Sequence, residues 1–158
     1  MKPFLQLITA ATGLAVLFAT PVAALGESAA AQGVTLTYTG VGTSHSRGTF
    51  RLQASNVSDA GSAVDSITEE SMGQVAGQSF IDVKFNLALK GRRGTLEIRW
   101  SGRYVSAGGP WEVVTGTWRI AKGTGEYAGA RGMGRIAGVF TAQGNRYFQR
   151  FQGSVTLA

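Results

Sequence analysis

Residues 123–134 read Gly-Thr-Gly-Glu-Tyr-Ala-Gly-Ala-Arg-Gly-Met-Gly. Five glycines in twelve residues lie between two segments in which apolar residues alternate with other residues. Glycine adopts backbone conformations closed to other residues and permits close approach of neighbouring chain. The stretch therefore predicts a tight corner between two strands. The residues expected to shape this corner are Gly123, Gly125, Tyr127, Gly129, Arg131 and Gly132.

Period-two alternation extends through most of the chain from Gly33 onward. It is clearest in residues 80–90, where every second residue is a large apolar one, and it recurs in residues 95–104 after a Gly91-Arg92-Arg93-Gly94 turn. Further strands are expected at 34–40, 48–55, 114–120, 133–142 and 146–157. The span 56–79 is the hardest to interpret, with one more strand at about 64–70.

Seven or eight short strands with tight turns and no long amphipathic helix indicate an all-β fold. An antiparallel meander must protect its edge strands, and closure into a barrel removes the edges altogether. We therefore predict a single antiparallel eight-stranded β-barrel. A two-sheet sandwich is the competing architecture.

The N-terminus has the pattern of a signal peptide. A lysine at position 2 precedes an apolar run, and small residues follow up to Ala24. This predicts a signal peptide over 1–24 with cleavage near Ala24, a flexible mature N-terminus over 25–32 and a barrel domain over 33–158. A secreted or periplasmic protein with no stable membrane span after processing is expected, and the absence of cysteine excludes disulfides.

The chain is basic, with 15 Lys and Arg against 9 Asp and Glu and a formal net charge of +6. In a secreted protein this charge favours anionic lipid, polysaccharide or another cell-surface polymer over nucleic acid as a partner. General solubility is the alternative explanation. The residues proposed for such a surface are Arg51, Arg92, Arg93, Arg103, Arg146 and Arg150.

Two adjacent segments carry a family resemblance. Thr-Gly-Thr-Trp-Arg-Ile at 115–120 and the corner sequence at 123–132 resemble the strand and corner signature of the allene oxide cyclase-like and dirigent-like barrels, in particular their small secreted bacterial branch. The resemblance implies an eight-stranded barrel with a hydrophobic lumen, often trimeric. Members cyclise a fatty-acid epoxide or direct phenoxy-radical coupling, but their catalytic residues do not align with this chain.

An aromatic set falls on the faces expected to point inward, with Gly102, Gly116 and Gly153 on the same faces, where they would leave free space. This predicts a lumen that binds a small hydrophobic or aromatic molecule without chemistry. The residues expected to line it are Tyr38, Phe85, Trp100, Tyr104, Trp118, Tyr147 and Phe151.

An isomerase or cyclase acting on an apolar substrate is the enzymatic alternative. If Ile67 points inward, period-two geometry places Asp65 and Glu69 inward as well, where burial would raise their pKa values for proton transfer. A solvated outer face is the alternative for both residues. With one histidine, no cysteine and no Asp-rich loop, the sequence predicts no metal site, and it suggests no cofactor.

Overall fold

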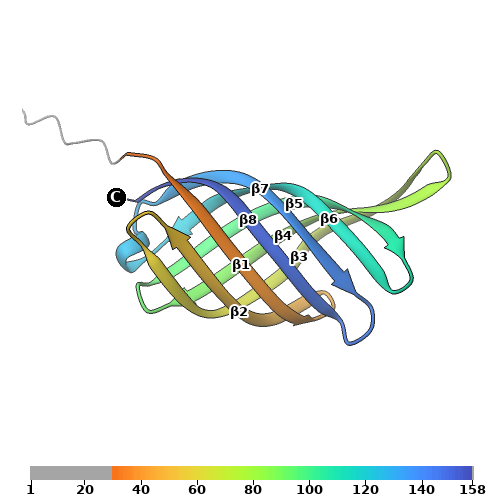
Figure 1. The fold of residues 1–158 in the computed structure, drawn as a ribbon, viewed down its shortest axis with the longest axis horizontal. Coiled ribbons are helices and arrows are strands. Elements are labelled where there is room, and N and C mark those ends of the chain that lie inside the picture. The colour runs from red at the N-terminus through yellow and green to blue at the C-terminus, as the bar shows by residue number, and fades with distance from the viewer. Residues whose placement is uncertain (1–29, 158) are drawn as a thin grey trace, which may run out of the picture.

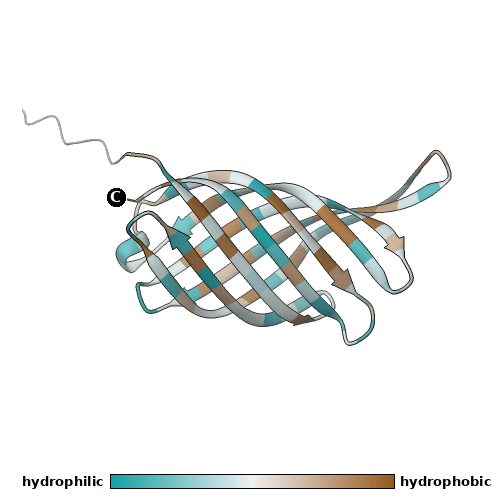
Figure 2. Ribbon diagram, viewed as in Figure 1, coloured by the Kyte–Doolittle hydropathy of each residue, from teal (hydrophilic) through white to brown (hydrophobic). Residues whose placement is uncertain are grey.

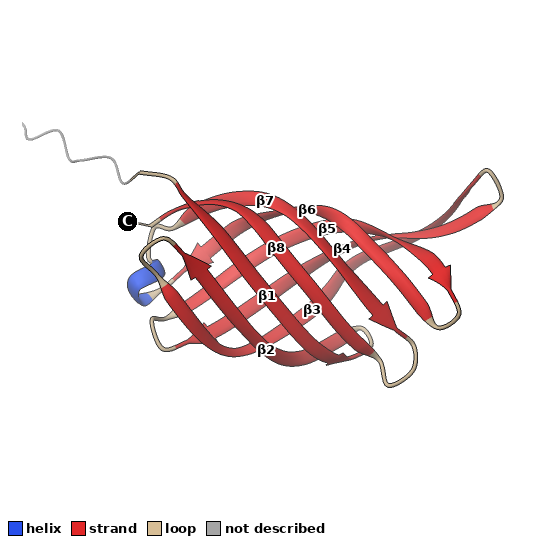
Figure 3. Cartoon of the chain, viewed as in Figure 1, coloured by secondary structure: helices blue, strands red, loops and turns tan. Residues whose placement is uncertain are grey.

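The computed structural model describes residues 30–157, which form a closed barrel of eight antiparallel strands (Figure 1). The strands are β1 (Gln32–Gly42), β2 (His45–Ala54), β3 (Ser58–Val75), β4 (Gln78–Gly91), β5 (Thr95–Gly108), β6 (Trp111–Gly123), β7 (Arg131–Thr141) and β8 (Arg146–Thr156). Figure 3 shows one helical turn beside the strands, the 3-10 helix η1 (Gly125–Tyr127) in the glycine-rich corner. Within the described range, no helix is long and apolar enough to cross a membrane.

Each strand pairs with its neighbour in sequence, and β1 pairs with β8 from Gln32 opposite Val155 to Val41 opposite Arg146. In Figure 1 this closure brings the orange and dark-blue ends of the ribbon side by side. Within the barrel every strand is paired on both sides, which confirms the predicted eight-stranded antiparallel barrel and excludes the sandwich.

Apolar and polar residues alternate along the strands, as the brown and teal bands in Figure 2 show. The inward residues of all eight strands form one hydrophobic core, in which Leu87 and Phe151 are completely buried. This core fills the barrel, because a ring of eight strands is just wide enough for side chains to meet at its centre.

The poorly patterned span 56–79 contains the whole of the longest strand. β3 runs from Ser58 to Val75, but its pairing with β2 ends at Ser66. The β3–β4 hairpin continues beyond the barrel as a two-stranded arm, residues 68–80, that projects from one end in Figure 1. Both faces of the arm meet solvent, so its sequence lacks the alternation of a half-buried strand.

The barrel therefore has two different ends. The corner end carries the β2–β3 and β4–β5 turns and the glycine-rich corner 123–130, and it lies next to the start of β1. The arm end carries the arm together with the β1–β2, β5–β6 and β7–β8 turns.

Candidate functional site

The seven side chains predicted to line the lumen are all buried inside the barrel. They pack against one another: the ring of Phe85 stacks on Trp100 with centroids 4.3 Å apart, and Trp100 meets the edge of Phe151 at 6.4 Å. The cavity found inside the lumen lies near Tyr127 and measures about 20 Å³. This is room for one water molecule rather than for an organic ligand.

The inward glycines do not enlarge this space. A Cβ added to Gly116 would lie 2.0 Å from the carbonyl oxygen of Ser101, and one added to Gly153 would lie 2.1 Å from that of Met133. At these positions glycine permits close approach of the neighbouring strand, so the expectation that they leave free space is wrong.

The polar atoms of the lumen aromatics find partners within the barrel. The Tyr38 hydroxyl lies 2.7 Å from the Ser46 hydroxyl, the Tyr147 hydroxyl donates to the Thr43 carbonyl at 3.1 Å, and the Trp118 indole donates to the Gln152 carbonyl at 3.1 Å. Burial raises the pKa of Tyr38 and of Tyr147 to about 12. Both phenols therefore remain neutral at physiological pH and act as hydrogen-bonding groups.

Asp65 lies inside the barrel, where the enzymatic hypothesis placed both candidate acids. Its side chain is completely buried, and its Oδ1 accepts a hydrogen bond of 3.1 Å from the Trp100 indole. Its Oδ2 has no partner among the described residues, and neither does the Oε1 of the buried Gln149. Burial raises the pKa of Asp65 to about 8, although the hydrogen bond from Trp100 acts in the opposite direction.

Glu69 lies outside the barrel, so the expectation of two inward carboxylates is wrong for this residue. The register of β3 against β4 shifts between Ile67 and Glu69, and this β-bulge reverses the alternation after Thr68. Glu69 is exposed and pairs with Lys84 at 2.6 Å. Among the described residues, no group of three or more His, Asp and Glu side chains is arranged to hold a metal ion.

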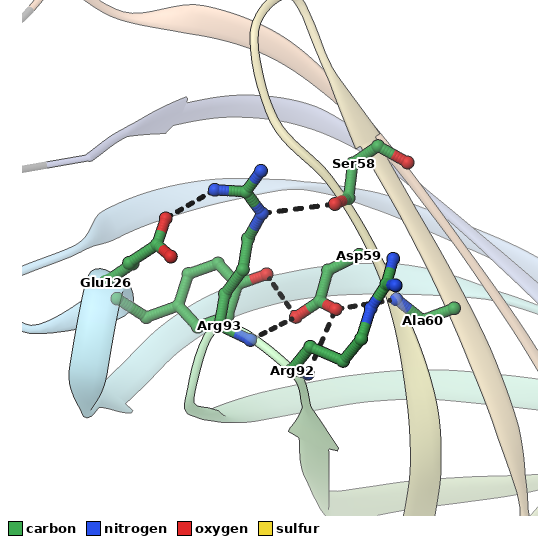
Figure 4. A network of polar contacts seen from close by, with 7 residues as sticks. Ser58, Asp59, Ala60, Arg92, Arg93 and Glu126 are labelled. Carbon is green, nitrogen blue, oxygen red and sulfur yellow. Dashed lines mark hydrogen bonds and ion pairs between the residues drawn. The ribbon is translucent and has the colours of Figure 1, made fainter.

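The glycine-rich corner closes the other end of the lumen. Its buried Tyr127 donates a hydrogen bond of 2.9 Å to Oδ2 of Asp59. The Asp59 carboxylate also accepts hydrogen bonds from the backbone N–H groups of Ala60, Arg92 and Arg93 (Figure 4). Burial alone would raise the pKa of Asp59. These four hydrogen bonds outweigh that effect and hold the pKa below its usual value.

Two corner positions favour glycine, one because of its backbone conformation and the other because of close packing. Gly125 has φ of +62°, and a Cβ on Gly123 would lie 1.9 Å from the carbonyl oxygen of Tyr127. Arg131 is the exposed first residue of β7, whereas Arg93 forms the ion pair with Glu126 that fastens the corner to the β4–β5 turn. These contacts indicate that the corner acts as a structural cap on this end of the barrel.

The arginines proposed for surface binding fall into two groups. Arg93 and Arg103 are engaged within the chain, with Glu126 and with Asp82 respectively. Arg51, Arg146 and Arg150 are exposed on the outer wall and form no ion pair with another described residue. Arg92 is also exposed, at the corner end.

A groove of about 860 Å³ lies on the outer wall across β4–β7. Its floor includes the short side chains of Ser101 and Thr117, which lie opposite each other on β5 and β6. Longer side chains from neighbouring positions also line the hollow. The principal long side chains are Lys84, Arg99, Arg119, Met133 and Arg135.

This groove is strongly basic. Arg99 lies directly opposite Arg119 in the β5–β6 ladder, and Arg135 lies opposite Thr117 in the β6–β7 ladder. All three arginines are exposed, and none forms an ion pair with another described residue. The acid that lines the groove, Glu69, is already paired with Lys84. Three guanidinium groups therefore face an open hollow with unused hydrogen-bond donors.

Sequence reasoning missed Arg99, Arg119 and Arg135 as a group. The period-two pattern does place each on an outward face, but their proximity depends on the register of three ladders. The partner of Asp59 was missed for a similar reason, because Tyr127 lies 68 residues away in the chain.

Comparisons with protein-family models, with curated proteins and with solved structures give no match for this chain.

Proposed function

We propose that the protein binds an anionic polymer carrying phosphate or sulfate groups, one segment of which lies in the β4–β7 groove. The observation that supports this proposal is the convergence of Arg99, Arg119 and Arg135 on a hollow of about 860 Å³ without an available acid. Guanidinium groups bind phosphate and sulfate through paired N–H donors, and a concave site lets several of them contact one anionic segment.

The outer wall is favoured over the lumen for a physical reason. A lumen ligand would have to displace aromatic side chains that already pack on one another around a cavity of about 20 Å³. A cyclase or isomerase would also need proton-transfer groups facing its substrate, and of the two candidate acids only Asp65 points inward. Repacking a full core costs free energy that binding in an open groove does not.

The test is the affinity for inorganic tripolyphosphate and for a heparin tetrasaccharide, measured by calorimetry at low and at physiological salt. The variant Arg99→Gln/Arg119→Gln/Arg135→Gln is expected to bind both at least about tenfold more weakly, because three charge-assisted contacts are lost. Binding to the wild type should weaken as salt rises, since exposed charges are screened over about 8 Å at physiological ionic strength.

A matched control separates the groove from net charge. The variant Lys90→Gln/Arg92→Gln/Lys122→Gln also removes three exposed positive charges, but outside the groove. Equal losses in the two variants would mean that general charge attracts the anion, and the proposal would then fail. Binding that does not change with salt would contradict it as well.

The finer sequence-based predictions remain predictions. The closed eight-stranded barrel is compatible with the allene oxide cyclase-like and dirigent-like proteins. If the chain belongs to that family, the resemblance implies that it forms a homotrimer. The signal peptide, with cleavage near Ala24, lies outside the described residues. A secreted or periplasmic location would put the groove in contact with cell-surface polymers.

A further inference from the structure

The net charge of the described residues is concentrated on one half of the barrel wall. Residues 58–130, from β3 through the corner, hold eight Lys and Arg and eight Asp and Glu. Residues 30–57 and 131–157 hold six arginines and no acid. These two segments are the opposite ends of the described chain, and the pairing of β1 with β8 joins them into one continuous surface.

Four of these arginines stand at the corners of a grid on β2, β1 and β8. Arg47 and Arg146 lie on either side of Val41, while Arg51 and Arg150 lie on either side of Thr37. With strands spaced at about 4.8 Å, the members of each pair are roughly 10 Å apart. All four are exposed, and we call these four residues the arginine face.

Large apolar side chains lie among and beside these arginines on the same outer wall. Phe148 lies on the β8 edge of the grid, midway between Arg146 and Arg150, and is 43% exposed; Val41 is 55% exposed. Phe148 on β8 lies opposite Val139 on β7, and Val139 lies opposite Val113 on β6. Trp111, two residues before Val113 on β6, is 46% exposed. We call the set an apolar strip: Val41, Trp111, Val113, Val139 and Phe148.

We propose that the arginine face and the apolar strip form a docking surface for an anionic lipid bilayer, a site separate from the β4–β7 groove. The arginines contact lipid phosphates, while Trp111, Phe148 and Val41 enter the boundary between headgroups and acyl chains. Tryptophan favours this boundary, and long basic side chains can keep their charged ends among the headgroups while their stems cover apolar surface. Anionic lipid attracts the basic face, which holds no carboxylate to oppose it.

A second copy of the chain fits this surface less well. An isologous contact would place the arginine face against itself, with no acid on either side to neutralise it. A fluid bilayer instead presents phosphates and hydrocarbon together and needs no fixed shape to match the convex barrel wall. Charge complementarity therefore favours the lipid surface.

The test is binding to vesicles of phosphatidylglycerol and phosphatidylcholine, with phosphatidylcholine vesicles for comparison. Sedimentation measures affinity, and tryptophan emission reports insertion, because Trp100 and Trp118 are buried and Trp111 is exposed. We expect the wild type to bind the anionic vesicles with a blue shift in emission that is quenched by brominated lipid. Arg47→Gln/Arg51→Gln/Arg146→Gln/Arg150→Gln should bind at least about tenfold more weakly.

The apolar contribution is tested by Trp111→Ser/Phe148→Ser, which should also bind about tenfold more weakly. Met72→Ser/Val75→Ser is the matched control, because both side chains are exposed and lie on the arm, outside the strip and outside the β4–β7 groove. The control should bind vesicles like the wild type. Thermal unfolding establishes that each variant is folded, and the emission of the wild type supplies evidence that needs no substitution.

Several results would overturn the inference. Equal binding to anionic and neutral vesicles would do so, and so would an unchanged emission of Trp111 on vesicle binding. A concentration-dependent emission shift without vesicles would assign the strip to a second copy of the chain. Failure here is distinguishable from failure of the groove proposal, since the strip variant should retain tripolyphosphate binding while the groove variant should lose it.

Discussion

The two ends of the barrel each bury one aspartate and surround it in opposite ways. At the corner end, Asp59 accepts four hydrogen bonds, and its pKa lies below its usual value. Towards the arm end, Asp65 accepts one side-chain hydrogen bond, from Trp100, and has an unpaired Oδ2. Burial raises its pKa to about 8. The charged form is thus favoured at Asp59, which has four donors at the barrel end, and disfavoured at Asp65, which lies deeper in the interior with one side-chain donor.

The difference follows from local backbone geometry. The β4–β5 turn directs two backbone N–H groups at Asp59, and the corner brings the Tyr127 hydroxyl to it. Asp65 instead lies in the middle of a strand whose backbone groups are engaged in the β2–β3 and β3–β4 ladders. Turns can supply spare donors to a buried carboxylate, whereas the interior of a closed sheet has few.

The largest expected effect in this comparison comes from removing the Asp59 carboxylate. Asp59→Ala leaves the donors of Tyr127, Arg92 and Arg93 without their acceptor in a buried position. We expect it to lower the free energy of unfolding at pH 7 by about 4 kcal/mol. Urea unfolding followed by tryptophan fluorescence measures this, and a loss below about 1 kcal/mol would mean that the corner does not depend on this carboxylate.

The next effect concerns Asp65 and pH. Because the folded pKa is raised to about 8, the folded protein holds a proton that the unfolded chain releases near pH 4. Stability should therefore fall as pH rises from about 4 to about 8 and then level off. In Asp65→Asn the amide cannot ionise, and its oxygen can still accept from the Trp100 indole.

This variant should be more stable than the wild type at pH 9 by a few kcal/mol and close to it at pH 5. Melting temperatures across this range provide the measurement. Asp59 predicts the opposite slope, with stability lost as pH falls below about 4, where its carboxylate becomes protonated. A wild-type stability that rises between pH 5 and pH 8 would contradict a protonated Asp65.

The smallest of the three effects is that of the Tyr127 hydroxyl. Tyr127→Phe keeps the ring that closes the corner end and removes one of four donors to Asp59. We expect a loss of about 1–2 kcal/mol, as for a hydrogen bond to a charged group, and a higher pKa for Asp59. Acid unfolding should begin at a higher pH than in the wild type, and an unchanged acid transition would show that the backbone donors are sufficient.

Much of the fold was predictable, because period-two alternation is a local property. It located strands from 80–90 onward and the inward positions of residues such as Trp100 and Phe151. The pattern failed at Glu69, since a β-bulge adds a residue to one strand without a local signature. Charge totals likewise gave no sign that six arginines from the two ends of the described chain share one half of the wall.

The sequence by itself determined that this protein is an antiparallel β structure with an aromatic interior and a glycine-rich corner. These properties depend on side-chain alternation and on glycine conformations, which act over a few residues. Only the tertiary structure decided the rest. Closure and register settled that the aromatics fill the lumen, that the two buried aspartates differ, and that arginines gather in a groove and on an acid-free wall. Those properties depend on strands that meet across the barrel, and one chain read from end to end does not reveal which residues become neighbours.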